Sequence, residues 1–282
     1  MTWDIRGKTV LVTGATSGIG LEASIELARR GARVALVGRD PTRTQAAVAA
    51  VKARGGGDAD SFPCDFSSQK SIRELSAAFA ARHDRLDVLV NNAGGVHKAR
   101  QVTQDGIEAT FAVNHLGYFL LTNLLLDLIV GSAPARIVTV ASIGHRRGTI
   151  DFDDLGFERG YSVTKTYSRS KLANVLFANE LARRLAGKGV TSNSLHPGAV
   201  ATNIWSGAPV WDKPIIFLLF RPFFISAAEG AKTIVDLAAG AEVDGVTGRY
   251  YENRKPSTPA PLAQDVALAA RLWDVSAKLV GL

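Results

Sequence analysis

Two tyrosine–lysine pairs with the same spacing stand close together in GYSVTKTYSRSKLANV, residues 160–175. Lys165 follows Tyr161 by four residues, and Lys171 follows Tyr167 by four. Residues four apart on a helix share a face, so either pair could act together as an acid and a base. A free tyrosine hydroxyl has a pKa of about 10, and an ammonium group one turn away would favour the phenolate at neutral pH.

Helix propensity favours the second pair. After Lys171 the chain reads LANVLFANELARRLAG, whose apolar residues recur at helical spacing, so Tyr167 and Lys171 would lie on the first turns of a helix over 165–186. Tyr161 follows a glycine, and valine and threonine, which are poor helix formers, come after it. We therefore expect the first pair to lie in the preceding loop and to take no part in the chemistry.

A glycine-rich turn joins the first expected strand to a helix. The strand KTVLVT runs into TGATSGIG, residues 13–20, and then into a segment of helical period. Glycines at 14, 18 and 20 would let the backbone approach a pyrophosphate, and the N-terminus of the helix would hold its charge. Strand, glycines and helix in this order predict a dinucleotide-binding site.

The end of the second expected strand, VALVGRDP, indicates which dinucleotide is bound. An acidic residue about 20 positions after the glycines favours NAD, whereas an arginine favours the 2′-phosphate of NADP. Gly38 stands at the tip of the strand, where a carboxylate would repel a phosphate, and Arg39 follows it. Asp40 has the spacing for NAD, but its place before Pro41 makes it a helix cap. The pattern favours NADP(H), with NAD(H) as the alternative.

Other polar residues stand at the expected carboxyl ends of buried strands, where doubly wound sheets bind ligands. LVNNAGG, residues 89–95, places two asparagines and two glycines there, and ARIVTVASIGH reaches such an end at Ser142. The Ser142 hydroxyl could donate to a substrate oxygen or could cap the strand. Asn114 lies in an apolar helical run, in which a buried amide needs partners such as a bridging water. A helix kink would also explain this asparagine.

Apolar runs of strand length alternate with segments of helical period through most of the chain, which is typical of βαβ units. The strand candidates are 8–13, 32–37, 61–63, 86–90, 135–141, 190–195 and 247–251. The helix candidates are 18–30, 41–54, 68–82, 104–129 in two pieces, 165–186, 227–239 and 262–279. We expect one doubly wound α/β domain over residues 1–282, with a parallel sheet, helices on both faces and a small aromatic-rich substrate lobe at 203–225.

Composition and charge narrow the class of protein. The net charge is +7, but the basic residues are scattered, so we expect no nucleic-acid binding. The single cysteine excludes an intrachain disulfide, and the five histidines lack metal-ligand spacing, so we expect no metal site. With no signal peptide and no apolar run of spanning length, we expect a cytoplasmic protein. The segment PIIFLLFRPFFI, residues 214–225, could contact a membrane surface.

Six features of the chain, over about residues 8–205, resemble the motifs of the short-chain dehydrogenase/reductase family and follow the same order. They are TGATSGIG, NNAG, Asn114, Ser142, YSRSK and HPG at 196–198. Four longer segments are similar to sequences of the retinol-dehydrogenase-like branch of this family: NHLGYFLLTNLLLDLI, SKLANVLFANELARRL, LHPGAVATNI and RLWDVSAKLVGL. The resemblance implies a Rossmann fold with seven parallel strands in the order 3-2-1-4-5-6-7. It also implies an enzyme of class EC 1.1.1.- that interconverts an alcohol and a carbonyl on a lipophilic small molecule. A homo-oligomer stays open.

The resemblance also implies roles for individual residues. Tyr167 would be the acid/base, and Lys171 would bond the nicotinamide ribose and lower the tyrosine pKa. Ser142 would hold the substrate oxygen, and Asn114 would anchor a water in the proton relay. The cofactor contacts it implies are Gly14, Thr16, Ser17, Gly18, Ile19, Gly20, Arg39, Asp65, Asn91, Ala93, Gly94, Tyr167, Lys171, Pro197, Gly198 and Thr202.

Three other functions remain as alternatives. One is a reductase of carbon–carbon double bonds, similar to the protochlorophyllide reductases, on the same scaffold. A second is a non-catalytic NADP-binding sensor, which would explain the glycines but not Ser142, Tyr167 and Lys171 together. A third is a peripheral lipid-binding protein that uses 214–225.

The aromatic residues of the predicted lobe favour an apolar substrate, although they could also serve only to pack the lobe on the body of the protein. They are Trp205, Trp211, Phe217, Phe220, Phe223 and Phe224.

Overall fold

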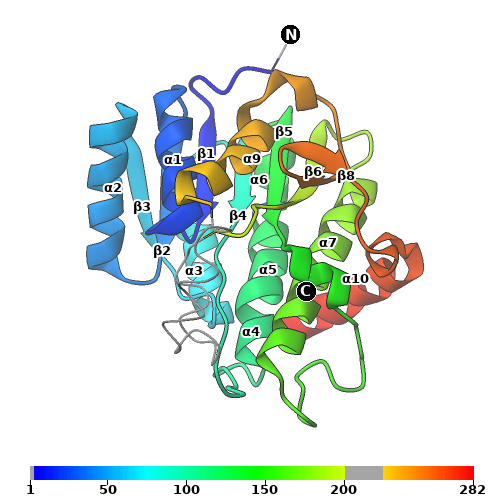
Figure 1. Cartoon of the computed structure of the whole chain (residues 1–282). Helices are drawn as coiled ribbons and strands as arrows, with labels where there is room; N and C mark the ends of the chain where they lie inside the picture. The colour runs from blue at the N-terminus through cyan, green and yellow to red at the C-terminus, as the bar shows by residue number, and fades with distance from the viewer. Residues whose placement is uncertain (1–2, 201–224) are drawn as a thin grey trace.

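A central eight-stranded sheet organises the computed structural model, which describes residues 3–200 and 225–282 (Figure 1). The strand order is β3-β2-β1-β4-β5-β6-β7-β8. The strands are β1 Thr9–Thr13, β2 Arg33–Gly38, β3 Ala59–Pro63, β4 Val88–Asn91, β5 Ala135–Val140, β6 Val190–His196, β7 Tyr250–Glu252 and β8 Lys255–Ser257. The first seven are parallel and have the order predicted from the sequence, which confirms the Rossmann fold.

The eighth strand corrects the predicted count of seven. It pairs antiparallel with β7 through a hairpin whose two loop residues, Asn253 and Arg254, both have positive φ angles, as tight hairpin turns require. The strand is only three residues long, and its central Pro256 has no N–H to donate. A proline is tolerated here because β8 is an edge strand, and it discourages pairing with another chain. With no alternation of apolar residues, the sequence carried no strand signal.

Helices cover both faces of the sheet (Figure 1). The helices α1 (Gly18–Arg29), α2 (Pro41–Gly55) and α9 (Ala227–Ala239) share one hydrophobic cluster with the strands. The helices α3 (Gln69–Ala80), α5 (Gly117–Leu124) and α7 (Val163–Arg184) pack on the other face, where α10 (Val266–Val280) lies against α7. Shorter elements are α4 Ala109–Phe111, η1 Ala112–Leu116, α6 Leu126–Gly131, η2 Ile143–Arg147, η6 Ala241–Val243 and η7 Pro261–Gln264.

The helix predicted over 104–129 begins later than expected and is interrupted. The Glu108 carboxylate accepts hydrogen bonds from the backbone N–H groups of Thr110 and Phe111, so the helix starts after it. Residues Ala112–Leu116 then form a π-helical turn, an irregularity that is frequent at functional sites. The helical run breaks only at Leu125, before α6, so the region does form two pieces, but the first boundary was predicted five residues too early.

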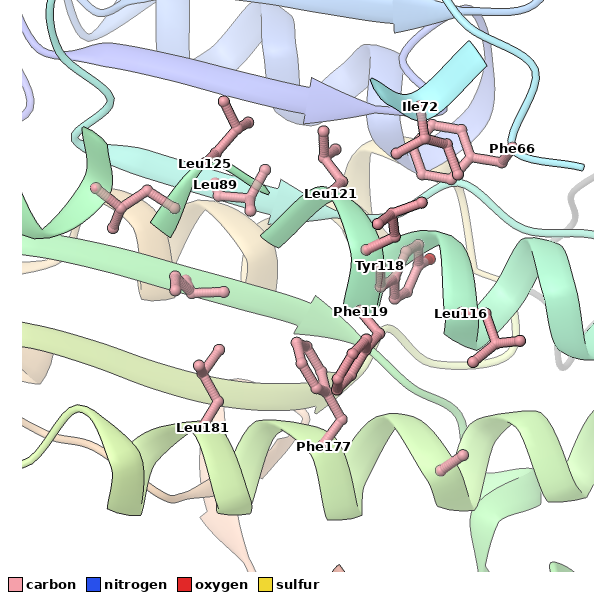
Figure 2. Close-up of a cluster of buried hydrophobic side chains, with 14 of the residues drawn as sticks. Phe66, Ile72, Leu89, Leu116, Tyr118, Phe119, Leu121, Leu125, Phe177 and Leu181 are labelled. Carbon is pink, nitrogen blue, oxygen red and sulfur yellow. The ribbon is translucent and has the colours of Figure 1, made fainter. Parts of the chain in front are cut away.

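Aromatic packing fixes α7 against its neighbours. Figure 2 shows Phe119 and Phe177 facing each other within the cluster of buried side chains beside the sheet. Phe177 stacks on Trp273 of α10 with ring centroids 5.8 Å apart, and Phe119 of α5 meets the same indole edge-on at 4.8 Å. Such pairs add to the free energy of burial and leave little room for movement. The helix that carries Tyr167 and Lys171 is thus packed tightly against its neighbours.

Candidate functional site

A cavity of about 950 Å³ opens at the carboxyl ends of the parallel strands. This is the edge at which doubly wound sheets bind their ligands. The described residues of the predicted site that line it are Gly14, Thr16, Ser17, Gly18, Ile19, Arg39, Asp65, Ala93, Gly94, Ser142, Tyr167, Lys171, Pro197 and Gly198. The fold therefore brings together groups that are distant in the sequence.

The glycine turn after β1 packs directly on the loop after β4. Gly14 has a φ of +64°, and a Cβ there would lie 2.7 Å from the Ala93 Cα. A Cβ at Gly20 would lie 2.4 Å from the Gly14 carbonyl oxygen. The Asn92 amide ties the loops together by donating to the carbonyl oxygens of Thr13 and Gly14 at 2.8 and 3.2 Å. Any side chain at these glycines would push the two walls apart.

Two predicted cofactor contacts within the described residues, Gly20 and Asn91, do not line the cavity. Gly20 lies behind the glycine turn, where it permits close packing. Asn91 is fully buried and donates to the Thr122 hydroxyl at 3.0 Å, while its neighbour Asn92 lines the cavity instead. Thr202 lies outside the described residues, as does the predicted lobe at 203–225 except for Ile225. The sequence NNAGG gave no way to tell which asparagine would face the cavity.

The tip of β2 has no room for a side chain. A Cβ at Gly38 would lie 2.3 Å from the Thr16 methyl group and 2.4 Å from the Thr44 hydroxyl. Asp40 is the N-cap of α2, as expected, and accepts from the Arg43 backbone N–H at 2.9 Å. Arg39 and Arg43 both line the cavity here. Sequence reasoning missed Arg43, although its place in the first turn after Pro41 would have aimed it at the strand tip.

The second tyrosine–lysine pair lies in the cavity wall. Tyr167 and Lys171 are both buried, and the Lys171 Nζ is 5.7 Å from the centroid of the tyrosine ring. That Nζ also donates to the Val140 carbonyl oxygen at 3.1 Å. Helix α7 begins at Val163, two residues earlier than predicted, so Lys165 is on its first turn and exposed. Neither Tyr161 nor Lys165 lines the cavity.

Burial is the largest influence on the pKa values of both Tyr167 and Lys171. It lowers the pKa of Lys171 from 10.5 to about 7, because the ammonium is removed from water. It raises the pKa of Tyr167, and the hydrogen bond with Ser142 acts in the opposite direction. The lysine is thus poised to gain or lose a proton near neutral pH. Its predicted lowering of the tyrosine pKa stays a prediction.

Ser142 faces Tyr167 from the end of β5. It caps the 3₁₀ turn η2, and its hydroxyl oxygen accepts from the Gly144 backbone N–H at 3.1 Å. A Cβ at Gly144 would lie 3.4 Å from the tyrosine ring, so the turn and the ring are in contact. The same hydroxyl also forms the hydrogen bond with Tyr167. Both functions considered from the sequence, cap and donor, are compatible with this geometry.

Asn114 lies in the π-helical turn and is fully buried. Its Oδ1 accepts from the Gly95 backbone N–H at 2.9 Å, and its Nδ2 donates to the Gly95 carbonyl at 3.0 Å and to the Ser170 hydroxyl at 3.1 Å. The side chain therefore fastens the loop after β4 to the helix that carries Lys171. Its predicted part in a proton relay stays a prediction.

Several apolar residues between the motifs complete the cavity. Val96 and Val113 line it, and so do Val102 and Ile143, whose side chains are unusually exposed at 50% and 44%. These four side chains add apolar surface to the cavity wall. No motif marks these positions, so sequence reasoning missed them.

Tyr161 joins two loops. Its hydroxyl donates to the carbonyl oxygen of His97, a residue that lines the cavity, at 2.8 Å. We expect Tyr161→Phe to lower kcat by less than about threefold, because one neutral hydrogen bond of about 1 kcal/mol is lost away from the reacting groups. Steady-state kinetics on the purified variant checks this. A loss as large as that of the same change at Tyr167 would mean that the wrong pair was chosen.

The described residues contain neither a grouping of metal ligands nor a helix that could span a membrane. Across 3–200 and 225–282, no three His, Cys, Asp or Glu side chains are grouped so that they could hold a metal ion. Within these ranges, no helix combines the length and apolar character needed to cross a membrane.

The comparisons with known proteins agree with this geometry. Residues 8–212 match the family model of the short chain dehydrogenases. Human retinol dehydrogenase 14 is 44% identical over 294 residues, which cover 99% of this chain and 88% of the relative. The "Putative daunorubicin C-13 ketoreductase DnrU" of Streptomyces sp. (strain C5) is 44% identical over 276 residues, which cover 98% and 93%.

Solved structures have the same fold. A crystal structure from Mycobacterium Paratuberculosis aligns with a TM-score of 0.79 at 33% identity, covering 99% of this chain and 96% of the other. A Beutenbergia cavernae "putative NAD(P) dependent gluconate 5-dehydrogenase" with bound NADP at low occupancy aligns with a TM-score of 0.71 at 27% identity, covering 90% and 97%. The chain belongs to the short-chain dehydrogenase/reductase family, in its retinol-dehydrogenase-like branch, and is an oxidoreductase.

Proposed function

We propose that the protein is an NADP(H)-dependent oxidoreductase that interconverts an alcohol and a carbonyl group on a lipophilic small molecule. The observation that carries the proposal is the convergence of Ser142, Tyr167 and Lys171 on one cavity. The same cavity extends to the glycine turn after β1 and to two arginines at the tip of β2. An acid/base pair and a dinucleotide cradle thus share one space.

The residues of the cavity fit NADP(H). Gly14 and Gly18 have positive φ angles, and the turn leads into the N-terminus of α1, which suits a pyrophosphate. At the tip of β2, Gly38 leaves no space for a carboxylate, while Arg39 and Arg43 offer positive charge for a 2′-phosphate. The Beutenbergia cavernae relative with bound NADP supports the same preference.

The residues of the chain supply proton transfer and orientation. When bound, NADPH supplies the hydride. Ser142 holds the carbonyl oxygen by donating its hydroxyl proton, and Tyr167 delivers its Oη proton to that oxygen. In the reverse direction Tyr167 accepts the proton of the alcohol. Lys171, when protonated, stabilises the phenolate that Tyr167 becomes after it gives up its proton.

The substrate is expected to be apolar. Val96, Val102, Val113 and Ile143 line the described part of the cavity, and two of them are exposed at its mouth. Burying such side chains against a substrate contributes about 25 cal/mol for each Å² of apolar surface removed from water. The names of relatives, retinol dehydrogenases and a daunorubicin ketoreductase, point to bulky carbonyl compounds as well.

A panel of aldehydes and ketones of increasing apolar size, assayed with NADPH and with NADH, tests the proposal. We expect NADPH to be consumed, with kcat/KM rising as the apolar part of the substrate grows. Cofactor binding without turnover of any carbonyl or alcohol would favour a non-catalytic sensor. A clear preference for NADH would overturn the assignment of the arginines.

The arginines at the tip of β2 are expected to select the cofactor. Arg39→Ala and Arg43→Ala should each raise the Kd for NADPH by about 10- to 100-fold and leave the Kd for NADH nearly unchanged, because hydrogen bonds to charged groups contribute about 1.5–3 kcal/mol. Titration of the intrinsic fluorescence measures both constants. Arg33→Ala, at the exposed opposite end of β2, is the control and should change neither. Equal losses for both cofactors would contradict the assignment.

A further inference from the structure

We propose that His145 is a positioning residue whose imidazole sets the orientation of Ser142. The inference rests on the function proposed above. His145 lies three residues after Ser142 in the turn η2, and its side chain is completely buried. It does not line the cavity, so it does not touch the substrate. Its influence on the reaction must therefore pass through the serine.

The ring has one hydrogen-bond partner on each nitrogen. Nδ1 lies 2.7 Å from the Ser142 carbonyl oxygen, and Nε2 lies 3.0 Å from the Ala260 backbone nitrogen. A carbonyl can only accept and a backbone N–H can only donate, so Nδ1 carries the proton and Nε2 is bare. Both bonds exist together only in the neutral ring. Burial agrees with this, because it lowers the pKa of His145.

The ring bond reaches the carbonyl oxygen of Ser142, and a backbone bond of the same turn holds its hydroxyl oxygen. The carbonyl oxygen receives the ring Nδ1–H and the backbone N–H of His145, the latter at 3.1 Å, while the hydroxyl oxygen receives the Gly144 N–H. The bond from the Ala260 backbone N–H to Nε2 fixes the tautomer in which Nδ1 carries the proton for Ser142. The ring also packs on Tyr250, with centroids 4.8 Å apart. The ring thus reinforces the short turn in which the Gly144 N–H holds the serine hydroxyl oxygen.

A second residue of the turn, Arg146, also bonds to the C-terminal segment, and its bonds do not involve Ser142. Arg146 donates to the Thr258 carbonyl at 3.0 Å and pairs with Glu252 at 3.5 Å. Its side chain is 39% exposed. Arg146→Ala therefore loosens the same C-terminal segment without removing a bond to the serine. It is the matched control for any effect that comes from the segment alone.

Two substitutions separate the two bonds of the ring. In His145→Asn the side-chain amide can donate from near the Nδ1 position and so keep the bond to Ser142. In His145→Gln the longer amide can accept at the Nε2 position and keep the bond to Ala260 instead. If the ring positions the serine, kcat should stay within about threefold for Asn and fall by about 10- to 100-fold for Gln. The Kd for NADPH and the activity of Arg146→Ala should stay near the wild-type values.

A double-mutant cycle with Ser142→Ala excludes a merely structural effect. In the Ser142→Ala background, His145→Gln should cause less than a twofold further loss of kcat, because nothing remains to be positioned. The same 10- to 100-fold loss in both backgrounds would overturn the inference. If the wild-type enzyme is active and His145→Gln leaves kcat unchanged, the inference is overturned as well. If the Gln variant does not fold, the Asn variant decides, and a loss above about tenfold contradicts the inference. A wild-type protein without activity on carbonyls or alcohols would instead refute the proposed function.

Discussion

Tyr167→Phe is expected to lower kcat for carbonyl reduction by about 10²- to 10⁴-fold, the usual contribution of a positioned general acid. The substitution removes only the hydroxyl, so the ring keeps its contact with Gly144 and its place on α7. Without the Oη proton, the developing alkoxide loses the group that we assign as its proton donor. The Kd for NADPH should change by less than about threefold.

The matched control for this change is Tyr161→Phe, which alters the same chemical group six positions earlier. Single-turnover measurement of NADPH oxidation with saturating ketone separates the chemical step from binding. If the Tyr167 variant keeps more than a tenth of the wild-type rate, Tyr167 is not the acid. The proton would then have to come from another group in the cavity, with Lys171 as the first candidate because its pKa is about 7.

Lys171→Met is expected to reduce kcat/KM by about 10²- to 10³-fold, the range found when one group that stabilises developing charge is removed. The same substitution should stabilise the free protein. Lys171 is 2% exposed, and methionine fills a similar volume without an ammonium to desolvate. A gain in the free energy of unfolding of about 0.5–2 kcal/mol at pH 7 is expected. Activity and stability thus move in opposite directions.

The gain in the free energy of unfolding of Lys171→Met should become smaller as the pH rises. In the folded protein the pKa of Lys171 is lowered to about 7 from the ordinary 10.5, so between these values the unfolded chain binds more protons. Wild-type stability therefore rises with pH across this window, and the advantage of the variant shrinks. Urea titrations from pH 6 to 10 measure the difference. Lys165→Met, at the exposed first turn of α7, should show no such dependence. A constant difference would contradict the burial argument.

Much of the fold was predictable because the strands are buried on both faces. Near-continuous apolar runs located most of these strands in the sequence, and the family resemblance implied the order of the seven parallel ones. Helix propensity after Lys171 placed the second tyrosine–lysine pair on α7, and the structure puts that pair in the cavity wall. These features depend on local sequence, and long-range contacts did not override them.

Features decided by single side chains could not be predicted. Whether Asn91 or Asn92 faces the cavity depends on a pairing with Thr122 that lies 31 residues along the chain from Asn91. The partners of His145 include Ala260, 115 residues away, so its buried position behind the cavity was not visible in the sequence. Edge strand β8 and the loop before Glu108 carry no periodic signal. Such positions follow from tertiary contacts alone.

Transfer of deuterium from NADPH labelled at the nicotinamide C4 to an α,β-unsaturated aldehyde tests the central claim most directly. Mass spectrometry of the product locates the label. The geometry of Ser142, Tyr167 and Lys171 predicts deuterium on the carbinol carbon of an allylic alcohol, with the double bond intact. Deuterium on the β-carbon of a saturated aldehyde would show reduction of the carbon–carbon double bond instead and would contradict the account.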